Sequence, residues 1–139
     1  MPHAQFLVSL KLILKNSEGK ILGLEAQMNG PMAGFYDLPG GRIDDNEVQI
    51  PFQEILRREL MEEIGNIECE ISSKPVAALS WVWPDGKKLT FIYFEGLLKS
   101  GDIKISDEHL SYKWIDVGEE TINKYFTSYH KQVLLQPLK

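Results

Sequence analysis

Residues 40–66 read GGRIDDNEVQIPFQEILRRELMEEIGN and join two glycines, an acidic loop and a run of charged residues. The second half of this stretch has the signals of a helix. Pro51 suits a first helical turn, the residues after it are rich in Glu, Arg and Leu, and Gly65 suits the terminating position. We therefore predict one helix over residues 51–64.

The predicted helix has two distinct faces at about 100° per residue. One is an aliphatic packing stripe formed by Leu56, Leu60 and Ile64. Beside it, Glu59, Glu62 and Glu63 crowd into one arc, where like charges three and four residues apart cost about 0.2–0.5 kcal/mol per pair. A bound cation would relieve this repulsion, and carboxylate oxygens are ligands that Mg²⁺ and Mn²⁺ prefer. The arc is a candidate metal site, and the alternative is a solvated charged face.

The glycines and acids of this stretch follow a specific spacing. Five residues separate Gly41 from Glu47, and the run RELMEEIG spans Arg58 to Gly65. This arrangement resembles the Nudix box of the Nudix hydrolases, whose pattern is Gly, five residues, Glu, seven residues, Arg-Glu, an aliphatic, any residue, Glu-Glu, any residue, Gly and an aliphatic. The lead-in YDLPGG, residues 36–41, is similar to the family's approach to the box.

The sequence departs from the family pattern in the length of one segment. Ten residues lie between Glu47 and Arg58 where the pattern has seven. We predict that the three extra residues lengthen the loop at residues 46–50 and leave the helix unbroken, because Pro51 is tolerated at a helix start but would break an interior turn.

One assignment within the box stays open for this reason, and a second departure lies at the end of the box. The extra length leaves Asp44 and Asp45 as rivals to Glu47 for the upstream acid. The closing aliphatic position holds Asn66, with Ile67 next to it.

The resemblance implies cleavage of a pyrophosphate bond by water, without a covalent enzyme intermediate. It implies Mg²⁺, or Mn²⁺, as cofactor, because clustered cations neutralise phosphate oxygens and lower the pKa of bound water. The implied metal ligands are the backbone carbonyl of Gly41 and the carboxylates of Glu59, Glu62 and Glu63. Arg58 would orient carboxylates, because its planar fork holds an acid in a fixed geometry. The remaining members of the box, Glu47 and Gly65, would be structural.

A further acid is expected outside the box. The loop at residues 99–109, KSGDIKISDEH, precedes the segment containing Trp114, and this place resembles where MutT-type members carry a fourth carboxylate. We choose Glu108, as a metal ligand or as the base that takes the proton from the attacking water, with Asp107 second. The alternative is a merely polar loop, because loops are generally hydrophilic. The predicted catalytic residues are thus Arg58, Glu59, Glu62 and Glu108.

The rest of the chain predicts a mixed β-sheet with helices packed on its faces, an α+β arrangement in the form of an α/β/α sandwich. This order of elements resembles the Nudix fold, and we expect residues 1–139 to form a single domain. The expected strands lie at residues 6–14, 21–27 and 110–117, and residues 67–83 and 88–98 are β-rich stretches that flank a hairpin turn at 84–87. A loop is expected at residues 28–41, and a helical stretch from about Glu119 to Leu135.

Aromatic residues supply candidates for stacking a nucleotide base. Core packing is the default for Trp81, Trp83 and Trp114. Alternate residues of a strand share one face, so Trp81 and Trp83 could stack a base if that face opens to a cleft. Phe35 and Tyr36, in the loop before the box, are similar candidates.

The substrate is predicted from a second, weaker resemblance. The run WVWPDGKKLTFIYFEG, residues 81–96, is similar to the MutT-type nucleoside triphosphate pyrophosphohydrolases. This implies cleavage of a nucleoside triphosphate, or an oxidised form of one, to the monophosphate and pyrophosphate. ADP-ribose or another nucleotide sugar is the runner-up. The alternative from another class is a Nudix-fold domain that binds nucleotides without hydrolysis, but such domains tend to lose acids that are intact here: Glu59, Glu62 and Glu63.

Composition limits the compartment and the partners. The formal charge of −5 argues against a nucleic-acid polymer, because a phosphate backbone selects clustered Lys and Arg. Residues 1–16 lack a basic start and Lys11 interrupts their apolar part, so we expect neither a signal peptide nor a membrane span. With Cys69 as the one cysteine, no intramolecular disulfide forms, and a reducing cytoplasm fits best. We expect a small nucleotide as partner and leave the oligomeric state open, with a homodimer as one option.

The histidines are widely separated in the sequence. His3, His109 and His130 show no metal-ligand spacing and are predicted to be surface or packing residues. His109 is the least secure of these predictions, because it adjoins Glu108.

Overall fold

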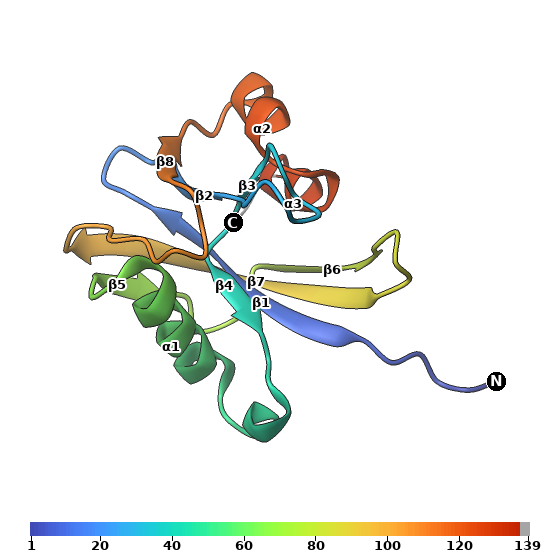
Figure 1. The fold of residues 1–139 in the computed structure, drawn as a ribbon. Helices are drawn as coiled ribbons and strands as arrows, with labels where there is room; N and C mark the ends of the chain where they lie inside the picture. The colour runs from blue at the N-terminus through green and yellow to red at the C-terminus, as the bar shows by residue number, and fades with distance from the viewer. Residues whose placement is uncertain (137–139) are drawn as a thin grey trace.

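The computed structural model describes residues 1–136, so the last three residues of the predicted domain lie outside the described part. A mixed sheet of eight strands forms its centre (Figure 1). In chain order the strands are β1 (Leu7–Lys15), β2 (Ile21–Glu25), β3 (Tyr36–Asp37), β4 (Gly40–Arg42), β5 (Glu68–Ile71), β6 (Ala77–Val82), β7 (Lys88–Ser100) and β8 (Tyr112–Ile115). The helices are α1 (Phe52–Ile64), α2 (Glu119–Tyr125) and α3 (Ser128–Leu134), with a short 3₁₀ helix η1 (Asp45–Glu47).

The two longest strands run parallel to each other through the middle of the sheet. β1 pairs with β7 along its whole length, and it also pairs antiparallel with β4 and with β2. β5 and β6 pair antiparallel with β7, and β8 pairs with β2. Because β1 has neighbours on both edges and helices over both faces, its residues 9–14 are all buried. This explains its nearly continuous apolar sequence.

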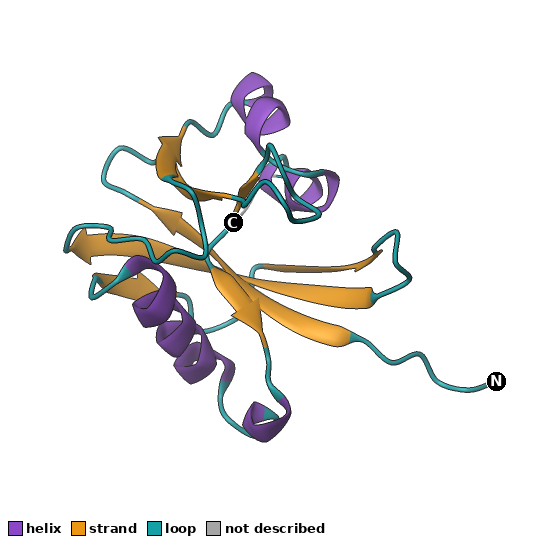
Figure 2. Ribbon diagram, in the orientation of Figure 1, coloured by secondary structure: helices purple, strands orange, loops and turns teal. Residues whose placement is uncertain are grey.

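Helices cover both faces of the sheet and divide the core into two layers (Figure 2). The layer under α1 joins its aliphatic stripe to alternate residues of β1: Leu10, Leu12 and Leu14. The other layer joins Ile13 and the β7 residues Phe91 and Tyr93 to residues of α3 such as Tyr129. The split follows from the alternation of side chains along a strand. The predicted mixed sheet with helices on its faces is confirmed.

Helix α1 runs without a break from Phe52 to Ile64, with Pro51 immediately before it. Residues 46–50 lie in the end of η1 and the turn after it, so the predicted position of the extra length and the unbroken helix are confirmed. The helix ends at Gly65, whose φ of +89° favours glycine.

The predicted helical stretch from Glu119 to Leu135 is wrong as a single element. Two helices form instead, because Phe126 takes an extended backbone conformation between them and makes a β-bridge with Tyr36. The side chain of Phe126 is fully buried in the core, which favours this break over a continuous helix. No helix among residues 1–136 has the length and apolar character needed to cross a membrane.

The predicted loop at residues 28–41 is also partly wrong, because it contains β3 and the start of β4. These strands are only two and three residues long and pair with β2 and β1 respectively. The stretch at residues 67–83, predicted to be β-rich, forms two strands, β5 and β6. The short strands β3 and β4 depend on distant pairing partners, so they leave no periodic pattern in the sequence.

Candidate active site

Arg58 of α1 lies among the acids of the predicted box. Its Nε donates to Oε2 of Glu47 at 2.8 Å, and its terminal nitrogens donate to Glu59 at 3.2 Å and Glu62 at 3.1 Å. The backbone N–H of Asp44 also donates to Glu47, at 3.0 Å. This N–H and Arg58 lower the pKa of Glu47, and the bond to Glu47 is the main cause of the raised pKa of Arg58. One guanidinium therefore fixes acids from the helix and from the preceding loop.

Glu63 occupies the buried side of this cluster and is only 4% exposed. Its Oε1 accepts the backbone N–H of Gly40 at 2.7 Å. Burial raises the pKa of Glu63 to about 8, although the Lys11 ammonium and the Gly40 N–H oppose the rise. A buried carboxyl of this kind is stabilised either by a proton or by a nearby cation.

Gly40 and Gly41 bring β4 close to both β1 and α1. Gly40 has a φ of +130°, and a Cβ at this position would collide with the carbonyl oxygen of Leu10. A Cβ on Gly41 would lie 2.6 Å from Oε2 of Glu59. Burial raises the pKa of Glu59, and the charge of Glu108 adds to this rise. The backbone of Gly41 therefore lies next to the carboxylate of Glu59, with no room for a side chain between them.

The loop after β7 closes over the C-terminal end of α1. The backbone N–H of Lys104 donates to the carbonyl of Ile64, and that of Ser106 to the carbonyl of Glu63, both at 3.0 Å. The last carbonyls of a helix lack partners within the helix, so these bonds satisfy groups that would otherwise stay unpaired. The loop is thereby fixed next to the acidic arc.

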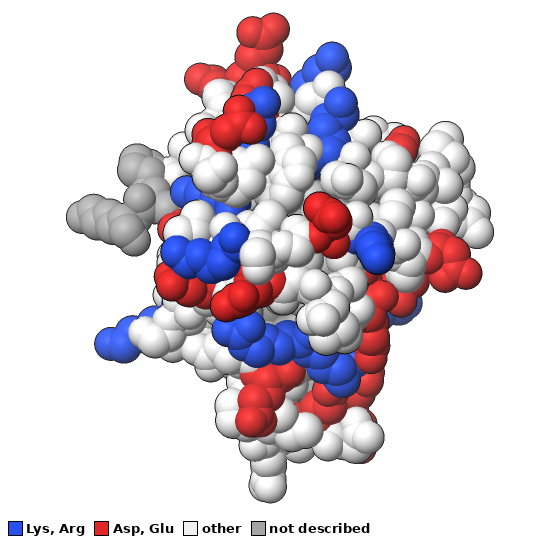
Figure 3. Space-filling view, turned by 90° about the vertical axis from the view of Figure 1, so that its left-hand side faces the viewer, with Lys and Arg blue, Asp and Glu red and all other residues white. Residues whose placement is uncertain are grey.

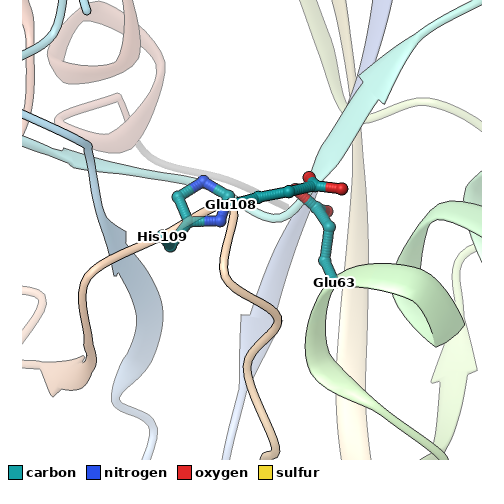
Figure 4. Close-up of side chains that lie close together, drawn as sticks. All are labelled: Glu63, Glu108 and His109. Atoms are coloured by element: carbon teal, nitrogen blue, oxygen red, sulfur yellow. The ribbon is translucent and has the colours of Figure 1, made fainter. Parts of the chain in front are cut away.

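The same loop is held from its other side by the region after β2. Gln27 donates its side-chain amide to the carbonyl of Asp107 at 2.8 Å, and Leu110 donates its N–H to the carbonyl of Glu25 at 3.0 Å. Glu108, between these attachments, points toward Glu63, as Figure 4 shows. A carboxylate oxygen of Glu63, one of Glu108 and a ring nitrogen of His109 lie within 4.8 Å of one another.

A pocket of about 180 Å³ adjoins the acids. Its wall is formed by Ser9, Lys11, Met32, Asp37, Gly41, Arg42, Trp83, Leu89, Phe91 and Tyr129. The guanidinium of Arg42 lies over the ring of Trp83, 5.1 Å from its centroid, and Phe91 stacks on Tyr129 at 4.9 Å. The pocket thus has aromatic, aliphatic and charged residues in its wall, and it reaches the acids at Gly41.

A buried chain of hydrogen bonds supports one wall of the pocket. Lys11 donates to Oδ2 of Asp37 at 3.0 Å, Nε2 of His130 lies 2.7 Å from Oδ1 of Asp37, and the Tyr93 hydroxyl lies 2.9 Å from Nδ1 of His130. Burial alone would raise the pKa of Asp37, but Lys11 and His130 bring it well below its ordinary value. Burial lowers the pKa of His130. A neutral His130 thus donates a hydrogen bond to an ionised Asp37 and accepts a hydrogen bond from the Tyr93 hydroxyl.

Comparison with known proteins identifies the family. A model of the NUDIX domain matches residues 6–136. The chain belongs to the Nudix family of hydrolases. A comparison with curated proteins finds no match. Among solved structures, the MutT protein from Methanosarcina mazei Go1 resembles this Nudix chain with a TM-score of 0.78 and 24% identity, over 97% of this chain and 94% of that one.

Two further Nudix structures are similar and carry ligand information in their own names. One is an Ap4A hydrolase from C. elegans, with a TM-score of 0.74 and 21% identity over 93% of each chain. The other is the NUDIX domain of Shewanella oneidensis NrtR complexed with ADP ribose, with a TM-score of 0.75 and 17% identity over 96% of this chain and 86% of that one. At these identities the similarity shows the fold.

The structure brings most of the predicted Nudix site residues together and leaves others apart. The box residues and Glu108 lie around the end of α1 described above. Trp83 lines the pocket, whereas Phe35, Tyr36 and Trp81 are not part of its wall. Tyr36 packs edge to face on Tyr125, and Trp81 packs near Tyr129. Their role in substrate binding stays a prediction.

Several residues of the hydrogen-bond chain beside the pocket were missed in the sequence. Lys11, Asp37 and His130 come from β1, β3 and α3, so no local spacing connects them. His130 was predicted to be a surface or packing residue, and it is fully buried in a polar network. The sequence held one signal for Lys11, because it is a lysine inside a mostly apolar strand and a buried charge needs a partner.

Proposed function

We propose that this Nudix hydrolase cleaves a nucleoside triphosphate, including an oxidised one, to the monophosphate and pyrophosphate. The observation that carries the proposal is the position of Gly41. Its backbone lies against the carboxylate of Glu59, and the same residue lines the pocket that contains Trp83. A nucleotide could therefore rest its base among aromatic rings while its phosphates reach the acids.

The donor set of the site fits a hard divalent cation, and we propose Mg²⁺, with Mn²⁺ as a substitute. The residues that would hold it are the carbonyl of Gly41 and the carboxylates of Glu59, Glu62, Glu63 and Glu108. The raised pKa of Glu63 favours the fit, because a carboxyl that is costly to ionise alone is stabilised by a cation. When bound, the cation would neutralise phosphate oxygens and make a water molecule more acidic.

The protein groups would have separate roles in this reaction. Arg58 would hold Glu47, Glu59 and Glu62 at fixed positions through the bonds described above. Glu108 would take the proton from the attacking water, since it is exposed and held beside Glu63 by a loop fixed at both ends. The phosphorus–oxygen bond to the leaving group would break as the water oxygen attacks, with no bond to the protein.

The pocket supports a planar aromatic group in the substrate. Trp83, Phe91 and Tyr129 line this pocket, and Arg42 packs over Trp83. On the face drawn in Figure 3, basic and acidic side chains are interspersed rather than gathered in separate patches. This supports a small nucleotide as the partner instead of a nucleic-acid polymer, which needs a continuous basic surface. We propose the cytoplasm as the compartment, because Cys69 is a free, buried thiol.

A substrate panel tests this proposal. The purified protein with Mg²⁺ would be incubated with the common and oxidised nucleoside triphosphates, ADP-ribose, nucleotide sugars and Ap4A, and the products separated by chromatography. We expect the highest kcat/KM with a triphosphate, with pyrophosphate as a product. Preferred cleavage of ADP-ribose or a nucleotide sugar would replace the proposed substrate. Tight binding without cleavage of any compound would indicate a non-catalytic nucleotide-binding domain.

A further inference from the structure

His109 lies at the junction of the loop after β7 and the buried end of the acidic arc. One of its ring nitrogens lies within 4.8 Å of a carboxylate oxygen of Glu63 and of one of Glu108 (Figure 4). Its Nδ1 is buried and has no hydrogen-bond partner among residues 1–136. Buried polar atoms in native proteins are nearly always paired, so an unpaired one needs a specific explanation.

Hydrogen bonding to the neighbouring acids does not account for this nitrogen. Within the described residues, no hydrogen bond joins His109 to Glu63 or Glu108, and Oε1 of Glu63 is engaged by Gly40 instead. A neutral imidazole carries a lone pair on one ring nitrogen, and a lone pair that accepts no hydrogen bond is available to a metal ion. A lone pair beside two carboxylates is the donor set of a mixed nitrogen and oxygen metal site.

The backbone on either side of His109 holds this arrangement in place. Ser106 is bonded to the end of α1 and Leu110 to β2, so both flanks of the Glu108–His109 pair are attached to regular elements. Asp107, immediately before the pair, is bonded through its carbonyl to Gln27. The backbone that carries the imidazole is therefore fixed before any ligand arrives, which reduces the entropy cost of binding.

We propose that His109 is a metal ligand, and that Glu63, Glu108 and His109 form a position that selects a first-row transition metal over Mg²⁺. This rests on the proposed function, in which Glu63 and Glu108 hold a cation. Mg²⁺ takes oxygen ligands, whereas imidazole nitrogen favours ions later in the transition series, such as Co²⁺, Ni²⁺ and Zn²⁺. The Nudix site would then hold cations of two kinds, with the box acids suited to Mg²⁺ and this position suited to a transition metal.

Metal titrations of the nucleotide-free protein test the proposal with Co²⁺ and Mg²⁺ as separate probes. In calorimetry, His109→Gln should weaken Co²⁺ binding by about tenfold or more and leave Mg²⁺ binding nearly unchanged. His3→Gln is the matched control, because it makes the same change in the exposed N-terminal segment. Glu108→Gln should weaken both ions. Equal Co²⁺ affinity in His109→Gln and the wild type would overturn the proposal, and so would equal losses for Co²⁺ and Mg²⁺.

A second variant tests directly whether residue 109 contacts Co²⁺. This test does not depend on the stability of His109→Gln. His109→Cys replaces the imidazole with a thiol, whose binding to Co²⁺ should give a near-ultraviolet charge-transfer band. The wild type is the control for any band from Co²⁺ binding to the native cysteine, Cys69, which is buried. Absence of the band in a folded His109→Cys protein that still binds Co²⁺ would show that residue 109 does not reach the metal.

The substrate panel and these titrations test the two proposals separately, so either proposal can be contradicted without the other. If the wild type cleaves nucleotides with Mg²⁺ and His109→Gln binds Co²⁺ normally, the proposed function stands and the ligand assignment falls. If no nucleotide is cleaved but His109→Gln loses Co²⁺ selectively, the ligand assignment stands and the proposed activity falls.

Discussion

Ser106 donates its backbone N–H to the carbonyl oxygen of Glu63 across 3.0 Å. The side chain of this same glutamate faces the predicted metal site, so one residue of α1 connects the box to the loop that carries Glu108. The bond satisfies a carbonyl at the end of the helix, where no intrahelical donor is available. The position of the loop acid therefore depends on how α1 ends.

The first prediction concerns Glu62, which is half exposed and bonded to Arg58. Glu62→Gln keeps the shape and removes the charge, so turnover with Mg²⁺ should fall by about 100-fold or more. Thermal stability should hold or rise slightly, because repulsion among the acids of α1 decreases while an exposed ion pair contributes little. Glu54→Gln, at an exposed site on the first turn of the same helix, is the control and should keep wild-type turnover. Unchanged turnover in Glu62→Gln would remove it from the metal site.

The second prediction separates Glu108 from its neighbour. Glu108→Gln should fold normally and lose most of its turnover, because an exposed loop acid contributes little to packing while its carboxylate faces Glu63. Asp107→Asn should behave as the wild type, since the backbone carbonyl of Asp107, rather than its carboxylate, is bonded to Gln27. Steady-state kinetics and thermal melts of both variants give the comparison. The reverse ranking would assign the role to Asp107.

The third prediction uses the close approach of Gly41 to Glu59. In Gly41→Ala the new Cβ would press on the Glu59 carboxylate, which must move, so turnover should fall strongly. Stability should change by only about 1 kcal/mol, because the colliding atoms are the end of a flexible side chain. Gly118→Ala, where a Cβ meets nothing within 4 Å, is the control for both measurements. A fully active Gly41→Ala would show that Glu59 does not need its present position.

The fourth prediction is a dependence of stability on pH. The charged and titratable groups packed around His130 are Lys11, Asp37, Tyr93 and Tyr129. The pKa of His130 is lower in the folded protein than its ordinary value near 6.5, chiefly through burial. Below about pH 6.5 the unfolded chain therefore binds a proton that the native state refuses, and the free energy of unfolding should decrease as the pH falls.

The variant His130→Gln isolates this effect. Denaturant unfolding of the metal-free protein at several pH values from 7 to 5 should show a shallower loss of stability for His130→Gln than for the wild type. The slope is the measured quantity, so the prediction holds even if the variant is less stable at every pH. His3→Gln should keep the wild-type slope. Equal slopes in all three proteins would mean that His130 is protonated to the same extent in both states.

Local signals in the sequence determined α1 and the spacing of its acids. Proline before the first turn, strong helix formers in the body and glycine at the end all act within one or two turns, so residues 51–64 predicted Phe52–Ile64 to within a residue. The same locality explains the placement of the extra loop residues. It also explains why the family resemblance could be drawn from residues 41–65, and the family match over residues 6–136 confirms it.

Only the tertiary structure decided which distant residues share the site. Asp37, His130 and Tyr93 meet in the core although they belong to β3, α3 and β7, and His109 reaches Glu63 because the loop after β7 caps α1. The same long-range packing split the predicted C-terminal helix at Phe126. These contacts depend on strand register and on unpaired backbone groups at element ends, which no periodicity within one segment records.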